Sequence, residues 1–500
     1  MNPDAPFLLT GNATATPWSE VPELPLQQLA DATSEALAEG TRLCAWFGVA
    51  EPGESATRVV CVVADDFGNT LGIARSLPAR TGYPSLTLRH PQAHLFEREL
   101  FEQHGLRPEG HPWLKPVRRT GPAGPEMLPF FQVEGGEVHE VAVGPVHAGI
   151  IEPGHFRFQC AGEEVLHLEI ALGYQHRGIE AASPGGPHPA TLCQMETIAG
   201  DSTIAHGTAY LMALEALAGI EPPLRAQWLR AIALELERLA NHTGDLGALA
   251  NDVAFLPTSS ACGKLRGDFL NLTALLCGNR FGRRLLTPGG CAYDLDDARV
   301  ARLVAGLRPA LAGVETAANW LWEASSVRSR FEGTGTVSRQ QALEMGLVGP
   351  AARASGLVRD VRFDHPAGWH RFAQLPVAVW PEGDVFARAR VRWLEIQRSG
   401  AFLLEQLAAP PPLEPGTGSI KAPMPDLQPD CLAVSLVEGW RGETCHVILT
   451  DDQARFRRHK IIDPSFHNWS GLALALRGQA ISDFPVCNKS FNLSYCGFDL

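Results

Sequence analysis

The sequence has no long apolar run. Its uninterrupted apolar stretches, such as residues 472–476, are far shorter than the roughly 20 residues that a helix needs to cross a bilayer. The N-terminus also lacks a basic segment followed by an apolar one, which is the pattern of a secretory signal. We therefore expect neither a membrane span nor a secretory signal.

The eleven cysteines form no close pairs. None stands in a C-x-x-C motif or another short-spaced pair, so the sequence has no disulfide framework and indicates reduced, buried thiols.

The sequence also has no excess of basic residues, and its formal net charge is −13. Proteins that bind nucleic acids generally need clustered Lys and Arg against the phosphates, so we expect no nucleic-acid partner.

The chain is long enough and apolar enough to form a folded core. Its 500 residues are 45% hydrophobic, which is enough for a substantial core and for two or more domains. In the first hundred residues, apolar periodicity predicts two helices and three strands. The expected helices are residues 26–38 and 71–77, and the expected strands are 44–50, 58–64 and 83–90, of which the first two form a hairpin.

A helix followed by a glycine-rich turn comes next. Helical spacing begins at His94, and Gly105 is expected to stop the helix. The segment resembles the 30-kDa-type subunit of respiratory complex I, whose signature is an E-R-E helix followed by a G-H-P turn. The matching residues are Glu97, Arg98, Glu99, Gly105, Gly110, His111 and Pro112. The resemblance implies a small α+β domain at residues 1–114, and the Pro- and Gly-rich residues 115–134 are interpreted as a linker.

After the linker, residues 138–180 alternate apolar and polar side chains around turn signals, which predicts a small antiparallel sheet. The segments GPVHAGIIEPGHFRF and LGYQHRGIE resemble the 49-kDa-type subunit of complex I and the large subunit of group 4 membrane-bound nickel-iron hydrogenases. With the 30-kDa-type domain fused, the chain is similar to the large subunit of formate hydrogenlyase. The resemblance implies an α+β chain in which residues 135–500 form a mainly helical domain with small antiparallel sheets. Long helices are expected at residues 230–255, 266–290 and 383–399, before a final section of strands and helices.

Two motifs resemble the metal-binding segments of those hydrogenases, in which two C-x-x-C pairs supply the soft thiolates that nickel and iron need. They are METIAGDSTIAH and NKSFNLSYCG. Aligned with the family pattern, the four cysteine positions are occupied by Ala199, Ser202, Ser494 and Gly497, and Cys496 lies one residue out of register. We therefore expect no nickel-iron centre and no metal bound by this chain.

Another kind of zinc or iron site stays open, because several ligand-type side chains could converge. They are His147, His155, His206, Glu169, Glu196 and Asp201. Equally, these side chains could be satisfied polar residues that line a former pocket.

Complex I provides a precedent for a vacated site. Its 49-kDa-type subunit also lacks the cysteines, and the cavity receives a quinone headgroup beside a histidine of the first β-turn. His147 matches that histidine, and an imidazole can donate a proton as a carbonyl oxygen gains charge. The family's second partner, a tyrosine, is replaced here by Asp201 and Ser202. His147 could also be a structural turn residue.

We therefore assign two sets of candidates. The catalytic candidates are His147, Glu196, Asp201 and His206, and the candidates for a quinone-like pocket are His147, His155, Ser202 and Ser494. Glu196 and His206 are expected on one helix and Glu235 on the next. These three could carry protons, or they could pair with Arg238, Arg280 or Arg362 and stabilise helix packing.

Two functions follow from the resemblance. The first is a redox subunit of an NADH:quinone oxidoreductase-like or hydrogenase-like complex, which passes electrons from a 4Fe-4S cluster of a partner to a quinone-like acceptor, coupled to ion movement. The second is a non-redox core subunit of an ion- or bicarbonate-transporting assembly. Both imply a small iron-sulfur subunit and antiporter-like and quinone-channel-like membrane subunits as partners. Both also imply a peripheral location on the cytoplasmic face of the inner membrane, with no cofactor bound by this chain itself.

Overall fold

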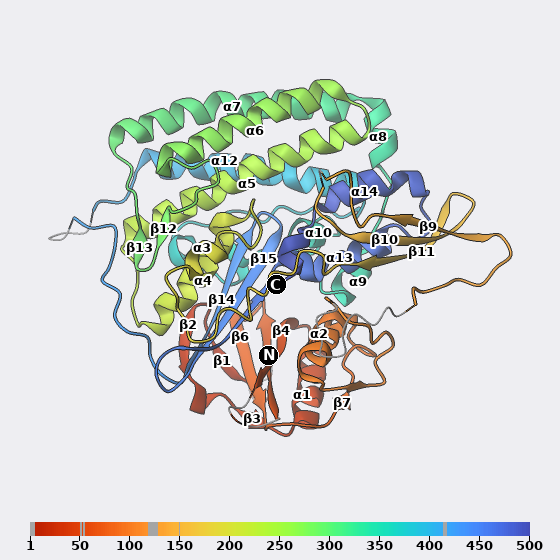
Figure 1. The fold of residues 1–500 in the computed structure, drawn as a ribbon. Coiled ribbons are helices and arrows are strands. Elements are labelled where there is room, and N and C mark those ends of the chain that lie inside the picture. Colours follow the sequence, from red (N-terminus) through yellow and green to blue (C-terminus); the bar gives the residue numbers. More distant parts are fainter. Residues whose placement is uncertain (1–5, 51–52, 54–55, 119–128, 150, 414–417) are drawn as a thin grey trace.

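A computed structural model describes residues 6–500 except 51–52, 54–55, 119–128, 150 and 414–417. Figure 1 shows an N-terminal domain in red and orange at the bottom, a sheet from the C-terminal part across the middle, and long helices over the top. A three-stranded sheet extends to one side. The α+β class expected from the sequence is confirmed. Within the described residues, no helix is both long and apolar enough to cross a membrane.

The N-terminal domain is a five-stranded sheet flanked by two helices. Its strands are β1 (Leu8–Thr10), β3 (Glu23–Leu24), β4 (Arg42–Ala50), β5 (Thr57–Asp65) and β6 (Thr70–Ser76), and its helices are α1 (Leu26–Ala38) and α2 (His94–His104). The predicted first helix and the hairpin of β4 with β5 are confirmed. Gly105 ends α2 in the left-handed conformation, at φ 70°, which glycine adopts without steric cost.

Two sequence predictions in this domain are wrong. Residues 71–77, expected as a helix, lie in β6, because this segment pairs with β5 on one side and β1 on the other. Sheet pairing outweighs local helix preference there. Residues 83–90, expected as a strand, contain only β7 (Tyr83–Pro84), which pairs with β8 (Pro108–Glu109). The Glu97 carboxylate accepts hydrogen bonds from the backbone N–H groups of Leu86 and Thr87, which turns the chain out of the strand.

The remainder of the chain is mainly helical. Its three-stranded antiparallel sheet, predicted from residues 138–180, is confirmed as β9 (Val138–Val143), β10 (His155–Ala161) and β11 (Glu164–Ala171). The longer helices are α4 (Thr203–Leu217), α5 (Leu224–Asp252), α6 (Leu256–Cys277), α7 (Asp297–Glu323), α12 (Val385–Ala408) and α13 (Pro464–Ala475). The shorter ones are α3 (Thr191–Met195), α8 (Ser325–Phe331), α9 (Arg339–Glu344), α10 (Gly349–Arg353), α11 (Val361–Asp364), α14 (Phe484–Phe491) and α15 (Tyr495–Phe498). Three-residue and four-residue 3-10 turns are η1 (Trp18–Glu20), η2 (Pro91–Ala93), η3 (Gly368–Arg371) and η4 (Ile481–Asp483), and a short ribbon pairs β12 (Leu286–Thr287) with β13 (Gly290–Cys291).

Three of the long helices correspond to the three predicted ones, although not in every boundary, whereas α7 has no predicted counterpart. Helices α5 and α12 overlap most of the predicted helices at 230–255 and 383–399. Helix α12 begins after Asp384, whose side chain accepts a hydrogen bond from the Ala387 N–H. The helix predicted at 266–290 ends at Cys277, because Gly278 takes φ 76° there. The Pro-Gly-Gly expected to stop it lies ten residues too late.

A four-stranded sheet joins the two parts of the chain. Strands β14 (Cys431–Gly439), β15 (Gly442–Thr450) and β16 (Phe456–Ile462) form a meander, and the N-terminal strand β2 (Thr14–Pro17) pairs with β14. All residues of β14 and β15 are buried, as expected for strands covered on both faces. The boundaries predicted at residues 114 and 134 stay predictions, and most of the predicted linker, residues 119–128, lies outside the described residues.

The N-terminal domain is attached through a buried ionic contact. The Lys460 ammonium on β16 donates to Glu99 of α2 at 2.7 Å and to Glu180 at 2.9 Å. Burial opposes ionisation of Glu180, but Lys460 and two arginines outweigh it and lower the pKa of this carboxyl to about 2. The contact therefore contributes to stability above the unfolded pKa near 4.5, and this contribution is lost as the pH falls towards 2.

Replacing Lys460 by methionine is expected to lower the free energy of unfolding by about 3–5 kcal/mol, because two buried carboxylates lose their shared cation. Denaturant unfolding of the full chain measures this change. Because Lys460 is the largest cause of the lowered pKa of Glu180, the loss of stability between about pH 4.5 and pH 2 should be smaller in the variant than in the wild type. Lys264→Met is the matched control, since Lys264 is 76% exposed. Equal destabilisation by the two changes would contradict the stabilising role given to the contact of Lys460 with Glu99 and Glu180.

Candidate functional site

The two sequence motifs meet at the guanidinium of Arg441, a residue of the turn between β14 and β15. Arg441 donates to both carboxylate oxygens of Asp201, at 2.6 and 2.8 Å, and to the Asn492 carbonyl at 2.6 Å. Asp201 belongs to the first motif and Asn492 to the second. One buried cation therefore holds together the two loops that sequence reasoning singled out.

Asp463 forms the floor of the same site. Its Oδ1 accepts from the Ser465 N–H and caps α13, while its Oδ2 makes a 2.9 Å hydrogen bond with His206 Nε2. A Cβ atom placed on Gly497 would lie 2.6 Å from this Oδ2, which is closer than a real Cβ approaches. The Asp463 carboxylate thus occupies the space that a side chain at position 497 would need.

Three buried histidines continue inward from Asp463. His206 Nδ1 lies 3.2 Å from His446 Nε2, and His446 Nδ1 lies 3.0 Å from His459 Nε2. Burial lowers the pKa of His446 well below its usual value, and it lowers the pKa of His459 to about 3. Both rings are therefore neutral at physiological pH, so each can accept a proton on one nitrogen while it gives one up from the other.

Burial and charge act in opposite directions on Asp463. Desolvation favours the protonated carboxyl, but the hydrogen bond from His206 and the nearby Arg441 outweigh it, so that the pKa of Asp463 lies below its ordinary value. Asp463 is therefore ionised at neutral pH and can accept a proton through His206.

The two serines at predicted cysteine positions take structural hydrogen bonds. Ser202 Oγ lies 3.4 Å from an Arg441 nitrogen that donates to it. Ser494 Oγ accepts from the Gly497 N–H at 2.9 Å and so caps α15. Cys496 Sγ lies 3.5 Å from Ser494 Oγ, and burial raises the pKa of this thiol to about 12. Cys496 is therefore a protonated thiol rather than a thiolate.

The predicted turn histidine lies beside this site but makes other contacts. His147 Nε2 bonds with the Gly154 carbonyl at 2.8 Å, and its ring packs against Phe156. The same turn reaches the C-terminal loop through Glu152, whose carboxylate accepts from the Tyr495 N–H. His155 points its ring towards Phe130 instead. The described contacts thus place Asp201, Ser202, His206 and Ser494 around Arg441 and Asp463, and leave both His147 and His155 at its edge.

Glu196 and His206 do not share a helix, which corrects the sequence interpretation. Glu196 is the C-cap residue of α3, which ends at Met195, and α4 begins only at Thr203. The Glu196 carboxylate accepts from the Arg284 N–H at 2.8 Å, and burial raises the pKa of this carboxyl.

Glu235 forms ion pairs that stabilise helix packing, which is one of the two roles that the sequence left open for it. Its carboxylate pairs with Arg238 at 3.1 Å and with Arg362 at 3.0 Å, and both partners are buried. Burial opposes ionisation, but these arginines lower its pKa to about 2. Glu235 is thus a permanently charged member of an ionic core.

No metal-binding cluster occurs in the described part of the chain. Across residues 6–500, apart from the gaps given above, no three His, Cys, Asp or Glu side chains are grouped as a metal ion would need. Two cavities lie elsewhere, one between α4, α5 and η3 and the other between α2, β11 and α13. Neither is lined by His147, Asp201, Ser202 or Ser494.

Sequence reasoning missed four residues of the site, namely Arg441, His446, His459 and Asp463. Two of them carried a signal, because Arg441 lies in EGWRGE and Asp463 in DPSFHNW, segments already matched to the family pattern. His446 and His459 lie on adjacent strands, and only strand pairing brings them into line with His206.

Comparisons with known proteins match both parts of the chain. The 49-kDa subunit of respiratory-chain NADH dehydrogenase matches residues 252–423 and 424–499, and the 30-kDa subunit matches residues 22–129. The carbon monoxide-induced hydrogenase of Rhodospirillum rubrum is 31% identical over 356 residues, which are 71% of this chain and 97% of the relative. The chain belongs to the family of complex I 49-kDa subunits and related hydrogenase large subunits.

Other members of this family extend the likeness to the fused form. Formate hydrogenlyase subunit 5 of Escherichia coli is 31% identical over 445 residues, covering 83% of this chain and 76% of the relative. A solved structure of a membrane-bound sulfane sulfur reductase, an archaeal respiratory membrane complex, superposes with a TM-score of 0.66 at 26% identity. That match covers 73% of this chain and 99% of the other. The chain is thus an oxidoreductase-type large subunit, fused to a 30-kDa-type domain.

Proposed function

We propose that this family member is the large subunit of the peripheral arm of a membrane-bound, energy-converting complex, and that it works without a nickel-iron centre. In this proposal a 4Fe-4S cluster of a small partner subunit supplies electrons, and a quinone-like molecule accepts them beside the C-terminal loop. Membrane subunits of antiporter-like and quinone-channel-like type couple the reaction to ion movement. The chain lies on the cytoplasmic face of the inner membrane.

The side chains at the four family cysteine positions do not fit nickel and iron. Ala199 and Gly497 offer no ligand atom, and Ser202 and Ser494 offer hydroxyls where soft thiolates are needed. A cysteine Cβ at position 497 would also lie 2.6 Å from Asp463 Oδ2, so the Asp463 carboxylate would have to move to admit it. No step of the proposed reaction is therefore assigned to such a centre.

The chain of hydrogen bonds from Asp463 through His206 to His446 is the observation that carries the proposal. A quinone supplies a carbonyl oxygen that takes up charge and then a proton. The buried Asp463–His206 pair holds a proton route at the loop that carries Ser494, and Arg441 keeps a positive charge beside it. Positioned acid–base groups of this kind are typical of sites where reduction is coupled to protonation.

A second candidate function is a non-redox core subunit of an ion- or bicarbonate-transporting assembly. One observation favours it: the bidentate Arg441–Asp201 pair already ties the two loops together without a ligand. Such a pair stabilises a shape, which is all that a scaffold requires.

The purified complex separates the two candidates. With a reduced viologen dye as electron donor, the redox proposal expects reduction of a short-chain quinone analogue and a nickel content far below one atom per chain. Stoichiometric nickel, measured by elemental analysis, would overturn the claim that no nickel-iron centre is present. If the complex moves ions but reduces no quinone analogue, the scaffold function is the correct one.

A further inference from the structure

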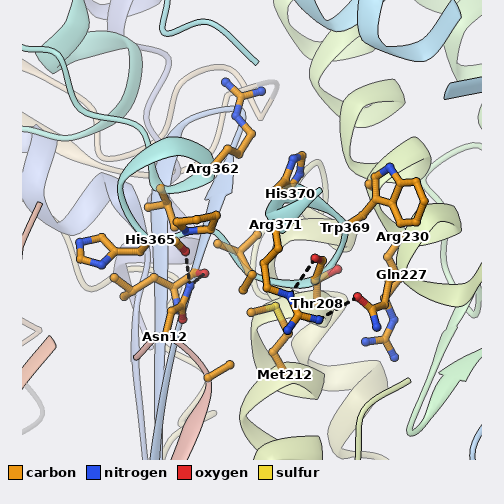
Figure 2. A pocket seen from close by; sticks show the side chains of 18 of the residues that line it. Asn12, Thr208, Met212, Gln227, Arg230, Arg362, His365, Trp369, His370 and Arg371 are labelled. Atoms are coloured by element: carbon orange, nitrogen blue, oxygen red, sulfur yellow. Dashed lines mark hydrogen bonds between the residues drawn. The ribbon is translucent and has the colours of Figure 1, made fainter. Parts of the chain in front are cut away.

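A cavity of about 310 Å³ lies between α4, α5, η3 and β14, away from the Arg441 site. Figure 2 shows η3, which carries Trp369, His370 and Arg371, beside Thr208 and Met212 of α4 and Gln227 and Arg230 of α5. Of the three η3 side chains, Arg371 reaches towards α4. Its size is at the lower end of the range of small-molecule sites.

Helix α4 separates this cavity from the proposed redox site. His206 points to Asp463, whereas Thr208 and Met212 line the cavity. Each helical residue turns by about 100°, so positions 208 and 212 project from the other side of the helix. The cavity is therefore a separate site and does not rest on the proposed function.

Three buried side chains that line the cavity have polar atoms without a protein partner. Within the described part of the chain, Thr208 Oγ1, Arg230 Nε and both ring nitrogens of His370 have none. All three residues are at least nine-tenths buried. Buried polar groups are hydrogen-bonded in the great majority of structures, so these atoms are available to an occupant that accepts and donates hydrogen bonds.

The charges that line the cavity are already balanced. Arg230 pairs with Glu215 at 2.6 Å, Arg362 with Asp360 at 2.6 Å, Glu438 with Arg353 at 2.7 Å, and Arg371 with Glu221. Burial lowers the pKa of His370 to about 4, so the ring is neutral. An ion would enter without a counter-charge, which is costly in a buried site.

Apolar side chains form the rest of the wall. Met212, Ala216, Leu234, Trp369 and Val437 line it. Such a surface favours contact with carbon over contact with water.

We propose that this cavity binds a small uncharged molecule, largely apolar, with a carbonyl or hydroxyl oxygen that hydrogen-bonds to His370, Thr208 and Arg230. The apolar part packs on Met212 and Trp369. Arg371 and Glu221, the most exposed of the lining ion pairs, lie at the rim.

Acetophenone and benzoate test the site on the full-length chain, since they are similar in size but only the second is charged. Calorimetric titration is expected to give saturable binding of acetophenone and at least tenfold weaker binding of benzoate. Ala216→Phe, which fills the cavity, should abolish the binding. The isosteric Thr208→Val should weaken it about threefold to tenfold through one lost hydrogen bond.

Thr316→Val, on the exposed face of α7, is the control and should bind acetophenone as the wild type does. Unfolding midpoints of all variants verify that they fold. The proposal is overturned if acetophenone shows no saturable binding, if its binding survives Ala216→Phe, or if benzoate binds equally well.

Discussion

Replacing Asp463 by asparagine is expected to lower the rate of quinone-analogue reduction by the purified complex about 100-fold, the lower end of what a positioned acid–base group contributes. Asparagine keeps the shape of the side chain, and its amide oxygen can still cap α13. It cannot take up a proton from His206. The measurement is the steady-state rate from pH 5 to pH 9 with a viologen dye as donor.

The pH profile separates a proton route from a structural role. The pKa of Asp463 lies below its ordinary value, so the wild-type carboxylate is ionised throughout this range. The loss in Asp463→Asn should therefore be present across the whole range, under conditions where the unfolding midpoint shows that the variant is folded. Asp452→Asn is the control, because Asp452 is exposed on the turn after β15. A variant rate within twofold of the wild-type rate would contradict the proposed proton route and favour the scaffold function.

Replacing Glu395 by glutamine is expected to lower the free energy of unfolding by about 3–5 kcal/mol, because the change breaks a buried ionic network on one side only. The Glu395 carboxylate accepts from Arg353 at 2.7 and 3.0 Å and bonds with His242 at 2.8 Å. Arg238 donates to it at 3.2 Å. With a neutral amide at this position, two guanidinium groups in the core lose their shared counter-charge.

The pH dependence of this effect has a definite sign. Burial opposes ionisation of Glu395, but Arg353 and His242 outweigh it and hold its pKa well below the usual value. The wild type thus gains stability from Glu395 above about pH 4.3, the unfolded pKa, and loses it in more acidic solution. The difference in the free energy of unfolding between the wild type and Glu395→Gln should therefore shrink as the pH falls below about 4.3.

Glu405→Gln is the matched control for the network, because it changes an exposed carboxylate on the same helix α12. Surface changes of this kind alter stability by about 0.5 kcal/mol or less. Denaturant midpoints of the two variants measured side by side provide the comparison. A Glu395→Gln variant as stable as Glu405→Gln would contradict the role given to the network.

Local sequence patterns correctly predicted those helices and strands whose tertiary contacts favour the same conformation. Helix α1 begins and ends where its apolar spacing indicated, and the β4–β5 hairpin and the sheet of β9 to β11 follow the predicted alternation. The failures occur where a distant partner decides the conformation. Residues 71–77 are a strand because β1 and β5 flank them, and residues after 84 leave the strand because Glu97 binds their N–H groups.

The candidate site was also predictable from the sequence only in part. The sequence by itself determined the family frame and the residue types at the four family cysteine positions, because both are properties of short motifs in order along the chain. Only the tertiary structure decided that Arg441 joins the two motifs and that Asp463, His206, His446 and His459 form one line. These groups lie up to 257 residues apart, and strand pairing together with the docking of α4 on β14 and β15 sets their distances.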